Sequence, residues 1–297
     1  MSERASEPGG HSSERAAFRV SQVLPTSATI RFLPLPVGPL ALLEAGAPGG
    51  HPVLFVPGYT GSKEDFAPLL EPLAAAGYRA VAMDQRGQFQ SPGVEDPTAY
   101  TVPALARDVL AVVGDLGQPV HLVGHSFGGL VSRAAVIARP AAFASLVLLD
   151  SGPSAIGGER RQRMDMLEPV LASGGTAAVY AILERYAEYA DPTWPATPAP
   201  LKRFLKRRFI ATHDLAMQAM GDALRTEPDR VAELAATAVR VLVAYGAGDD
   251  AWPPPVQDAM AARLGAPVAV IPDAGHSPAM ENPQSLLRAL TGFWPGG

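Results

Sequence analysis

The sequence predicts an α/β fold: a mostly parallel central sheet of about eight strands, covered by helices on both faces, with a helical lid inserted after the sixth strand. Two observations predict it. Short runs that are apolar on both faces alternate with segments of helical periodicity, as in parallel sheets joined by right-handed crossovers. The alternation stops over residues 153–236, which are mostly helical and punctuated by Pro, and then resumes.

The first strands are expected to be antiparallel, because β-favouring runs separated by Pro and Ser precede residue 53, at 17–24, 28–33 and 40–46. The continuous apolar runs expected to form parallel strands are 53–57, 79–83, 119–124, 144–149, 240–245 and 267–272. Ser62 followed by Asp65 is typical of a helix cap, and Gly77 ends that helix. Further helices are expected at about 102–116, 127–138, 255–264 and 283–293.

This pattern divides the chain into a tail, a core and a lid. Residues 1–16 alternate charged and small polar residues without an apolar run, so a disordered tail is expected there and not a signal peptide. Residues 17–152 and 237–297 are expected to form the core, and 153–236 the helical lid. No unbroken apolar stretch reaches the roughly 18 residues of a membrane-spanning helix. We therefore expect a soluble, cytoplasmic chain with no membrane partner, either monomer or homodimer.

Composition limits the chemistry. The chain has 297 residues, a net charge of −5 and no cysteine. The absence of cysteine excludes disulfides, thiolate metal sites and a cysteine nucleophile. The acidic balance gives no electrostatic reason to expect nucleic acid as a partner, so a small-molecule substrate is expected. Arginine far outnumbers lysine in a background rich in Ala, Gly and Pro, which indicates a GC-rich bacterial genome.

Ser126 lies between Gly124 and Gly128 in VHLVGHSFGGL, after an apolar strand and before a helix that begins at Phe127. Ligands of α/β sheets bind beyond the carboxyl ends of the strands. A turn this sharp strains the serine backbone and brings strand and helix so close that only glycine fits on either side. The pattern therefore predicts a nucleophilic serine that projects into a cleft, with the positive end of the following helix directed at it.

A serine hydroxyl is a poor nucleophile until a base takes its proton, so a histidine is expected nearby in space. The six histidines are His11, His51, His121, His125, His213 and His276. His276, in PDAGHSP, follows the last predicted strand and so lies at the same edge of the sheet as Ser126. The others lie in the tail, before or within a strand, beside the serine on the same turn, or in the lid. His276 is therefore the predicted base.

A carboxylate must orient His276 and stabilise its imidazolium. Three aspartates follow strands: Asp249 and Asp250 in AYGAGDDAWPP, and Asp150 at the end of ASLVLLD. All three qualify by order along the chain and by their place near the same edge. Consecutive residues in a turn point in different directions, so Asp249 and Asp250 cannot both face the histidine. The residues alone leave this choice open.

Five pieces of sequence, in order, resemble the α/β-hydrolase superfamily, in its single-domain serine esterase-like branch with a helical lid. They are VPGYTGS (56–62), MDQRG (83–87), GHSFGG (124–129), YGAGDD (245–250) and AGHSPAMENP (274–283). The resemblance runs from about Val53 to the C-terminus. It implies that the backbone N–H groups of Tyr59 and Phe127 form an oxyanion hole. It also implies that the acid is Asp249, the third residue after the glycine of the seventh strand.

Two positions depart from the family's pattern. Pro57-Gly58 stands where His-Gly is frequent, which removes a side-chain contact near the oxyanion turn but keeps its N–H groups. Phe89, in QFQS, stands where the family has a glycine, and it alters a loop beside the pocket. Ser126 argues against the haloalkane dehalogenases and epoxide hydrolases of this fold, which use aspartate at that position.

The expected function is hydrolysis of a carboxylic ester, thioester or lactone with an apolar portion, through an acyl-enzyme intermediate and with no metal or cofactor. Carbon–carbon bond hydrolases, proline-releasing aminopeptidases and perhydrolases share the serine and stay open. So does a non-catalytic ligand-binding member of the fold, because fold alone does not establish activity. The expected pocket residues are Tyr59, Phe127, Trp252, Met217 and Met220.

Overall fold

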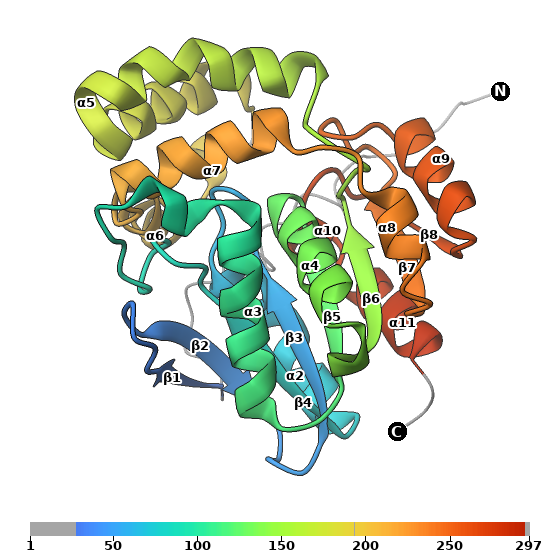
Figure 1. Ribbon diagram of the computed structural model, residues 1–297. Coiled ribbons are helices and arrows are strands. Elements are labelled where there is room, and N and C mark those ends of the chain that lie inside the picture. The colour runs from blue at the N-terminus through green and yellow to red at the C-terminus, as the bar shows by residue number, and fades with distance from the viewer. Residues whose placement is uncertain (1–27, 193, 295–297) are drawn as a thin grey trace, which may run out of the picture.

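The computed structural model describes residues 28–192 and 194–294. Within them an eight-stranded sheet has the strand order β1-β2-β4-β3-β5-β6-β7-β8 (Figure 1). β2 pairs antiparallel with β1 and β4, and every other pair of neighbouring strands is parallel. The predicted α/β fold with a mostly parallel sheet is therefore confirmed. The expected tail at 1–16 and the strand at 17–24 lie outside the described residues.

The bounds of the elements follow the predicted alternation closely. The strands are β1 Thr29–Leu33, β2 Leu40–Ala45, β3 His51–Val56, β4 Tyr78–Met83, β5 Val120–His125, β6 Phe143–Leu149, β7 Val241–Gly246 and β8 Val268–Ile271. The α-helices are α2 Ala67–Ala75, α3 Val102–Leu116, α4 Phe127–Ala138, α5 Gly158–Ala190, α6 Ala199–Ile210, α7 Asp214–Thr226, α8 Val231–Ala235, α9 Pro254–Leu264, α10 Pro278–Glu281 and α11 Pro283–Phe293. Short 3₁₀ helices are η1 Lys63–Phe66, η2 Pro97–Tyr100, η3 Pro140–Ala142 and η4 Trp194–Ala196.

Helices cover both faces of the sheet (Figure 1). α3 and α4 lie on one face, where Leu105, Val109 and Val131 belong to a buried apolar cluster. α2 and α11 lie on the other face, where Leu69 and Leu286 belong to a second cluster. The central strands are buried on both sides, as their continuous apolar runs predict, because helices exclude water from each face.

The carboxyl ends of the parallel strands lie side by side at one edge of the sheet. The register places Val56, at the end of β3, beside Gly124 in β5. It likewise places Leu149, at the end of β6, beside Ala244 in β7. The turns that leave these strands are therefore neighbours in space, although distant parts of the sequence supply them. This edge holds the residues that the sequence predicts to be catalytic.

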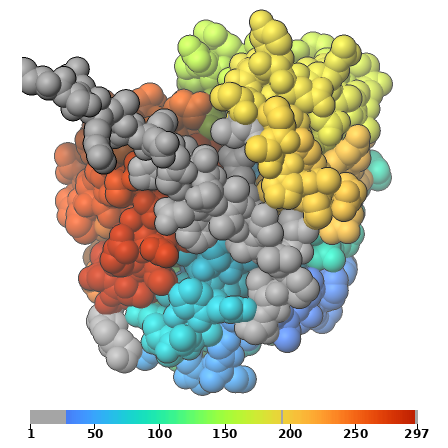
Figure 2. Space-filling view, turned by 180° about the vertical axis from the view of Figure 1, so that it is seen from behind, coloured from blue at the N-terminus to red at the C-terminus, as the bar shows by residue number. Residues whose placement is uncertain are grey.

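Three helices, α5 to α7, form the insertion that follows β6. α5 packs against α6 and α7, and the three lie together beyond the carboxyl edge of the sheet (Figure 1). Figure 2 shows atoms of α5 and α6, in yellow-green to yellow, above the blue and cyan atoms of the first strands and α2. The backbone of α5 breaks at Gly175, where φ is 67° and ψ is −171°. α8 packs instead against α4 and α9, and its Val231 and Leu234 belong to the same apolar cluster as Leu105 of α3.

One helix within the described residues, α5, is long and apolar enough to span a membrane by length and composition alone. The sequence-based expectation that no such stretch exists was wrong by this measure. It relied on an unbroken apolar run, whereas the serine, glycines and threonine inside α5 still leave a mean hydropathy of 1.4 over its most apolar part. Of that part of α5, 22% is buried within the structure.

Candidate active site

Ser126 occupies the turn between β5 and α4. Its φ of 53° and ψ of −123° lie in a region that residues other than glycine rarely adopt. A Cβ at Gly124 would lie 2.5 Å from the carbonyl oxygen of Gly128, and a Cβ at Gly128 would lie 2.4 Å from that of Val56. The crowding predicted from the sequence is therefore present. It leaves the Ser126 side chain facing a cavity, among whose lining residues it is found.

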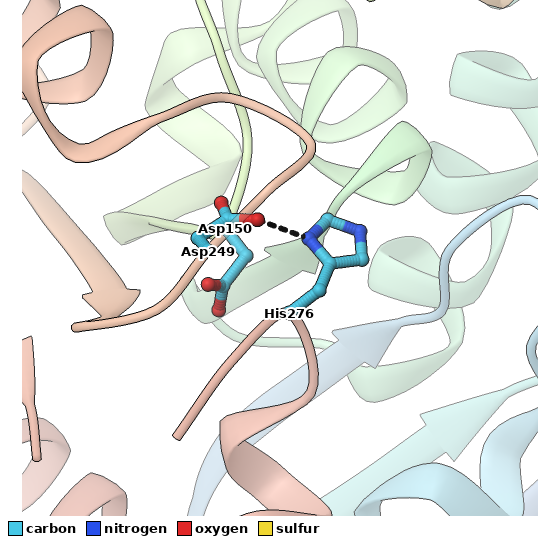
Figure 3. Close-up of side chains that lie close together, drawn as sticks. All are labelled: Asp150, Asp249 and His276. Atoms are coloured by element: carbon cyan, nitrogen blue, oxygen red, sulfur yellow. Dashed lines mark hydrogen bonds and ion pairs between the residues drawn. The ribbon is translucent and has the colours of Figure 1, made fainter. Parts of the chain in front are cut away.

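A series of hydrogen bonds joins Ser126 to a histidine and an aspartate. The Ser126 hydroxyl lies 3.0 Å from Nε2 of His276, a residue 150 positions later in the chain. On the other side of the ring, Nδ1 lies 2.8 Å from Oδ1 of Asp249 (Figure 3). A carboxylate at Nδ1 fixes the tautomer in which Nδ1 carries the proton and Nε2 is free to accept one. The ring is thus oriented to take the hydroxyl proton of Ser126.

Asp249 is buried and held by further donors. The N–H of Ala251 donates to Oδ1 at 2.9 Å, and Nε2 of Gln257 donates to Oδ2 at 2.7 Å. Burial alone would raise the pKa of Asp249, but the hydrogen bond to His276 and its charge outweigh that effect, so the pKa lies below the usual range. Asp249 is therefore an ionised acceptor for the imidazole. Gln257, which helps to hold it, has no signal in the sequence beyond its place on a predicted helix.

The two other candidate aspartates make different contacts. Asp250 accepts hydrogen bonds from Arg160 at 2.9 and 2.6 Å and is largely exposed to solvent. Asp150 lies buried beside Asp249 (Figure 3), where its Oδ1 accepts the Gly246 N–H at 2.9 Å and its Oδ2 has no hydrogen-bond partner among the described residues. Burial, and then the charge of Asp249, raise the pKa of Asp150 well above the usual range. Asp150 makes no hydrogen bond to His276, so it does not orient the imidazole.

Asp150, Asp249 and His276 are also, within the described residues, the one group of carboxylates and imidazoles close enough to share a metal ion. Their ligand atoms lie within 4.8 Å of one another. A metal ion would need the lone pairs of His276 Nδ1 and Asp249 Oδ1, which already take part in the hydrogen bond between them. The arrangement therefore fits an oriented imidazole better than a metal site.

Two backbone N–H groups near Ser126 are free to bind an anion. Neither the Tyr59 N–H nor the Phe127 N–H donates a hydrogen bond to any described residue. Phe127 is the first residue of α4, so its N–H lies at the positive end of the helix. Tyr59 follows Gly58, and a Cβ at Gly58 would lie 3.1 Å from the Ser126 Cβ. Both groups are therefore next to the serine, from two different strand ends.

The remaining histidines that the structure describes take part in other contacts. His125 donates from Nε2 to the carbonyl oxygen of His276 at 2.6 Å, and burial, with the nearby His276 charge, lowers its pKa to about 4. His121, in β5, contacts the Ser145 hydroxyl at 2.8 Å. His213 precedes α7 and His51 begins β3, so both lie farther from Ser126 along these elements.

A cavity of about 480 Å³ opens over Ser126. Its floor comes from the strand-end loops, including Gly58, Tyr59 and His276. Its wall comes mainly from the insertion and combines apolar with charged side chains. The apolar ones are Leu167, Leu171, Val179, Leu183, Leu201, Leu205, Phe209 and Met217, and the charged ones are Arg160, Arg163, Glu168, Arg208 and Arg225. Of this wall, only Met217 was expected from the sequence. The four-residue spacing between Leu167 and Leu171, and between Val179 and Leu183, is the signal that could have identified these residues.

Three of the expected pocket residues do not line this cavity. Met220 is fully buried in the apolar cluster that also contains Leu105 and Val131. It lies three residues after Met217, on the face of α7 that packs on the core. Trp252 packs against Gly152 and donates from its indole N–H to the Ser154 carbonyl oxygen. The Phe127 side chain is likewise buried in the core. Of the expected set, only Tyr59 and Met217 line the cavity.

Phe89 has a backbone conformation that favours glycine. Its φ of 38° lies in the left-handed region, where a residue with a side chain is strained. The ring packs edge-on against Phe204 of α6, with the centroids 5.9 Å apart, and lies 4.8 Å from Nζ of Lys63. The substitution therefore places an aromatic contact between a core loop and the insertion.

Residues 53–289 match the model of a family described as the Alpha/beta hydrolase family. The putative carbamate hydrolase RutD of Variovorax paradoxus (strain S110) is 40% identical over 114 residues, which cover 38% of this chain and 42% of that protein. A dihydrolipoyllysine-residue acetyltransferase component of the acetoin cleaving system from Pseudomonas putida is 29% identical over 261 residues, or 86% of this chain and 66% of that protein. The chain thus spans less than two thirds of the length of these curated relatives.

Solved structures of similar fold include hydrolases. A thermophilic esterase from Thermogutta terrifontis is 25% identical, with a TM-score of 0.71 over 90% of this chain and 97% of that one. An enol-lactonase from Burkholderia xenovorans LB400 is 21% identical, with a TM-score of 0.73 over 89% of this chain and 99% of that one. The second likeness concerns the fold alone.

Proposed function

Because this chain belongs to the alpha/beta hydrolase family, we propose that it is a serine hydrolase that cleaves a carboxylic ester, thioester or lactone through an acyl-enzyme intermediate. The series of hydrogen bonds from Ser126 through His276 to Asp249 carries the proposal. A serine, a base within hydrogen-bond reach of it and a carboxylate that orients the base are the parts that acyl transfer to serine requires. The esterase from Thermogutta terrifontis, similar in fold and 25% identical, adds support.

In the proposed reaction, Ser126 Oγ attacks the carbonyl carbon while His276 Nε2 takes its proton. The N–H groups of Tyr59 and Phe127 donate to the oxygen that becomes negative in the tetrahedral intermediate. His276 then gives the proton to the leaving alcohol or thiol, or to the alkoxide of an opened lactone. A water molecule, deprotonated by the same nitrogen, releases the acyl group from Ser126. Asp249 stabilises the imidazolium that forms in both halves of the reaction.

The cavity favours a small-molecule substrate with an apolar portion. Most of its wall is built from aliphatic and aromatic side chains of α5 to α7, and covering an apolar group with them is favourable because it removes apolar surface from water. Four arginines and Glu168 of the insertion also line the cavity, so a substrate with a polar portion besides the apolar one fits it. In this proposal the insertion acts as a lid, because it supplies that wall directly over Ser126. The chemistry proposed here uses side chains and backbone groups of this chain and needs no nucleic-acid or membrane partner.

A fluorophosphonate probe tests the proposal. We expect it to label the wild-type chain at Ser126, since the reagent forms a covalent bond with an activated serine. The matched control is Ser126→Ala, which should not be labelled and should lose roughly 10⁶-fold in kcat on nitrophenyl esters. Equal labelling of the wild type and Ser126→Ala would contradict the proposal. So would a wild type that reacts neither with the fluorophosphonate probe nor with nitrophenyl esters. The second of these results is what a non-catalytic ligand-binding protein would give.

A further inference from the structure

Two buried glutamines hold the loop that follows β3. Nε2 of Gln85 donates to the carbonyl oxygen of Pro57 at 2.9 Å. Nε2 of Gln88 donates to the carbonyl oxygens of Gly58 at 2.8 Å and Tyr59 at 3.2 Å. Oε1 of Gln88 accepts the backbone N–H of Gln85 at 3.0 Å, which fixes the orientation of the Gln88 amide. Three successive carbonyl groups of this loop are therefore held from the side of the core.

Peptide geometry connects one of these carbonyls to the chemistry. The carbonyl of Gly58 and the N–H of Tyr59 belong to the same planar trans peptide unit, so they point in opposite directions. Gln88 is fully buried and does not line the cavity, whereas Gly58 and Tyr59 do. A Gly58 carbonyl that points to Gln88 therefore directs the Tyr59 N–H away from the core, toward the side on which Ser126 lies.

This peptide unit needs an external restraint. Gly58 lacks a Cβ, so rotation of the peptide about its flanking bonds meets less steric resistance than at any other residue type. The Tyr59 side chain is fixed elsewhere, because its hydroxyl donates to the Met217 carbonyl oxygen at 2.7 Å. That bond holds the phenol and does not by itself fix the peptide between Gly58 and Tyr59. The Gly58 carbonyl oxygen accepts two hydrogen bonds, one from the Gly61 N–H within the loop at 3.1 Å and a shorter one from the Gln88 amide at 2.8 Å, which ties it to the core.

We propose that Gln88 is a positioning residue for the hydrolysis: by holding the Gly58 carbonyl it aims the Tyr59 N–H at the developing oxyanion. This inference rests on the proposed function, since it assigns Tyr59 to the oxyanion hole. A preorganised donor stabilises the transition state because it need not reorient as charge develops. Loss of the Gln88 amide would leave substrate binding largely intact and weaken stabilisation of the transition state.

Gln85 supplies a matched control in the same loop. It makes an equivalent buried amide-to-carbonyl bond, but one peptide earlier, to Pro57. That peptide carries the Gly58 N–H, which is not one of the two donors assigned to the oxyanion hole. Substitution of Gln85 should therefore loosen the loop to a similar degree without redirecting the Tyr59 N–H.

The experiment compares Gln88→Met with Gln85→Met in steady-state hydrolysis of p-nitrophenyl butyrate, with thermal unfolding of both. Removal of a whole oxyanion donor costs about 10²–10³ in kcat, so a misdirected one should cost roughly 10- to 100-fold in kcat with little change in KM. Gln85→Met should lower Tm similarly but change kcat by no more than about threefold. An unchanged kcat in Gln88→Met, or equal losses in both variants, would overturn the inference.

Gln88→Glu adds a readout that a purely structural role would not move. An introduced carboxylate would accept the Gln85 N–H but repel the Gly58 carbonyl, whereas the protonated carboxyl could donate to that carbonyl. The ratio of kcat in Gln88→Glu to kcat in wild type should therefore rise as pH falls, and a flat ratio would refute the assignment. A wild type that fails to react with fluorophosphonate would instead refute the proposed function itself.

Discussion

Replacement of Asp249 with Asn should lower kcat by about 10⁴-fold, because the imidazole of His276 depends on this one carboxylate for orientation and charge. Both Asp249 oxygens face N–H donors: Oδ1 faces His276 and Ala251, and Oδ2 faces Gln257. An asparagine amide must therefore direct its NH₂ at a donor in either orientation.

The two orientations damage catalysis in different ways. If the NH₂ faces Nδ1 of His276, the ring adopts the tautomer whose Nε2 carries a proton and cannot accept one from Ser126. If the NH₂ faces Gln257, the tautomer is kept but no negative charge remains to stabilise the imidazolium. A 10⁴-fold loss corresponds to about 5 kcal/mol of activation free energy, at 1.36 kcal/mol per factor of ten.

The assay is initial-rate hydrolysis of p-nitrophenyl butyrate, with Asp150→Asn and Asp250→Asn as controls of identical chemistry. Asp150 accepts a hydrogen bond from the Gly246 N–H and none from His276, so an amide in its place leaves the imidazole oriented, and kcat should stay within about threefold. Asp250 loses only an exposed ion pair with Arg160, which contributes little. Near-normal turnover in Asp249→Asn, with a collapse in either control, would show that the acid was assigned wrongly.

Other predictions concern the cavity, the serine turn and pH. Met217→Ala should shift the preferred acyl chain of nitrophenyl esters to greater length, whereas Met220→Ala should lower Tm without such a shift, since only Met217 lines the cavity. Gly128→Ala should lower the free energy of unfolding by about 2–3 kcal/mol, because its Cβ would meet backbone atoms. Gly292→Ala, whose Cβ would lie in open space on α11, should raise it by about 0.5 kcal/mol. Urea titrations measure both changes. His125 has a folded pKa of about 4, below its unfolded value of about 6.5. The unfolded chain therefore binds the proton first, so stability should fall as pH drops from 6.5 to 4, and His125→Gln should flatten that decline.

The fold was predictable because its signals are local. Continuous apolar runs gave the parallel strands, and the helix expected at 255–264 is found at Pro254–Leu264. The Ser62 and Asp65 cap signal also holds, although a 3₁₀ turn at Lys63–Phe66 precedes α2 there. The strand expected at 28–33 is found at Thr29–Leu33. In each case the neighbouring residues alone determine the backbone conformation.

The site was predictable only in part, because its finer features depend on packing between distant segments. Gly-x-Ser-x-Gly identifies a turn, and strand order brings His276 to the same edge. No local pattern shows that Asp250 pairs with Arg160, 90 residues away, or that Asp150 is buried beside Asp249. The choice between Met217 and Met220 likewise depends on which face of α7 meets the core.

The separation of Ser126 and His276 by 150 positions has a consequence during synthesis of the chain. Ribosomes add about 5–20 residues per second, so roughly 8–30 seconds pass between incorporation of the serine and of its histidine. For that interval the strained turn can form against β3, while no base exists to take the serine's proton. If the proposed reaction is right, the growing chain cannot carry it out until β8 and the loop after it have been made, and the hydrolase activity of purified chains ending at successive positions should appear as a step only beyond residue 276.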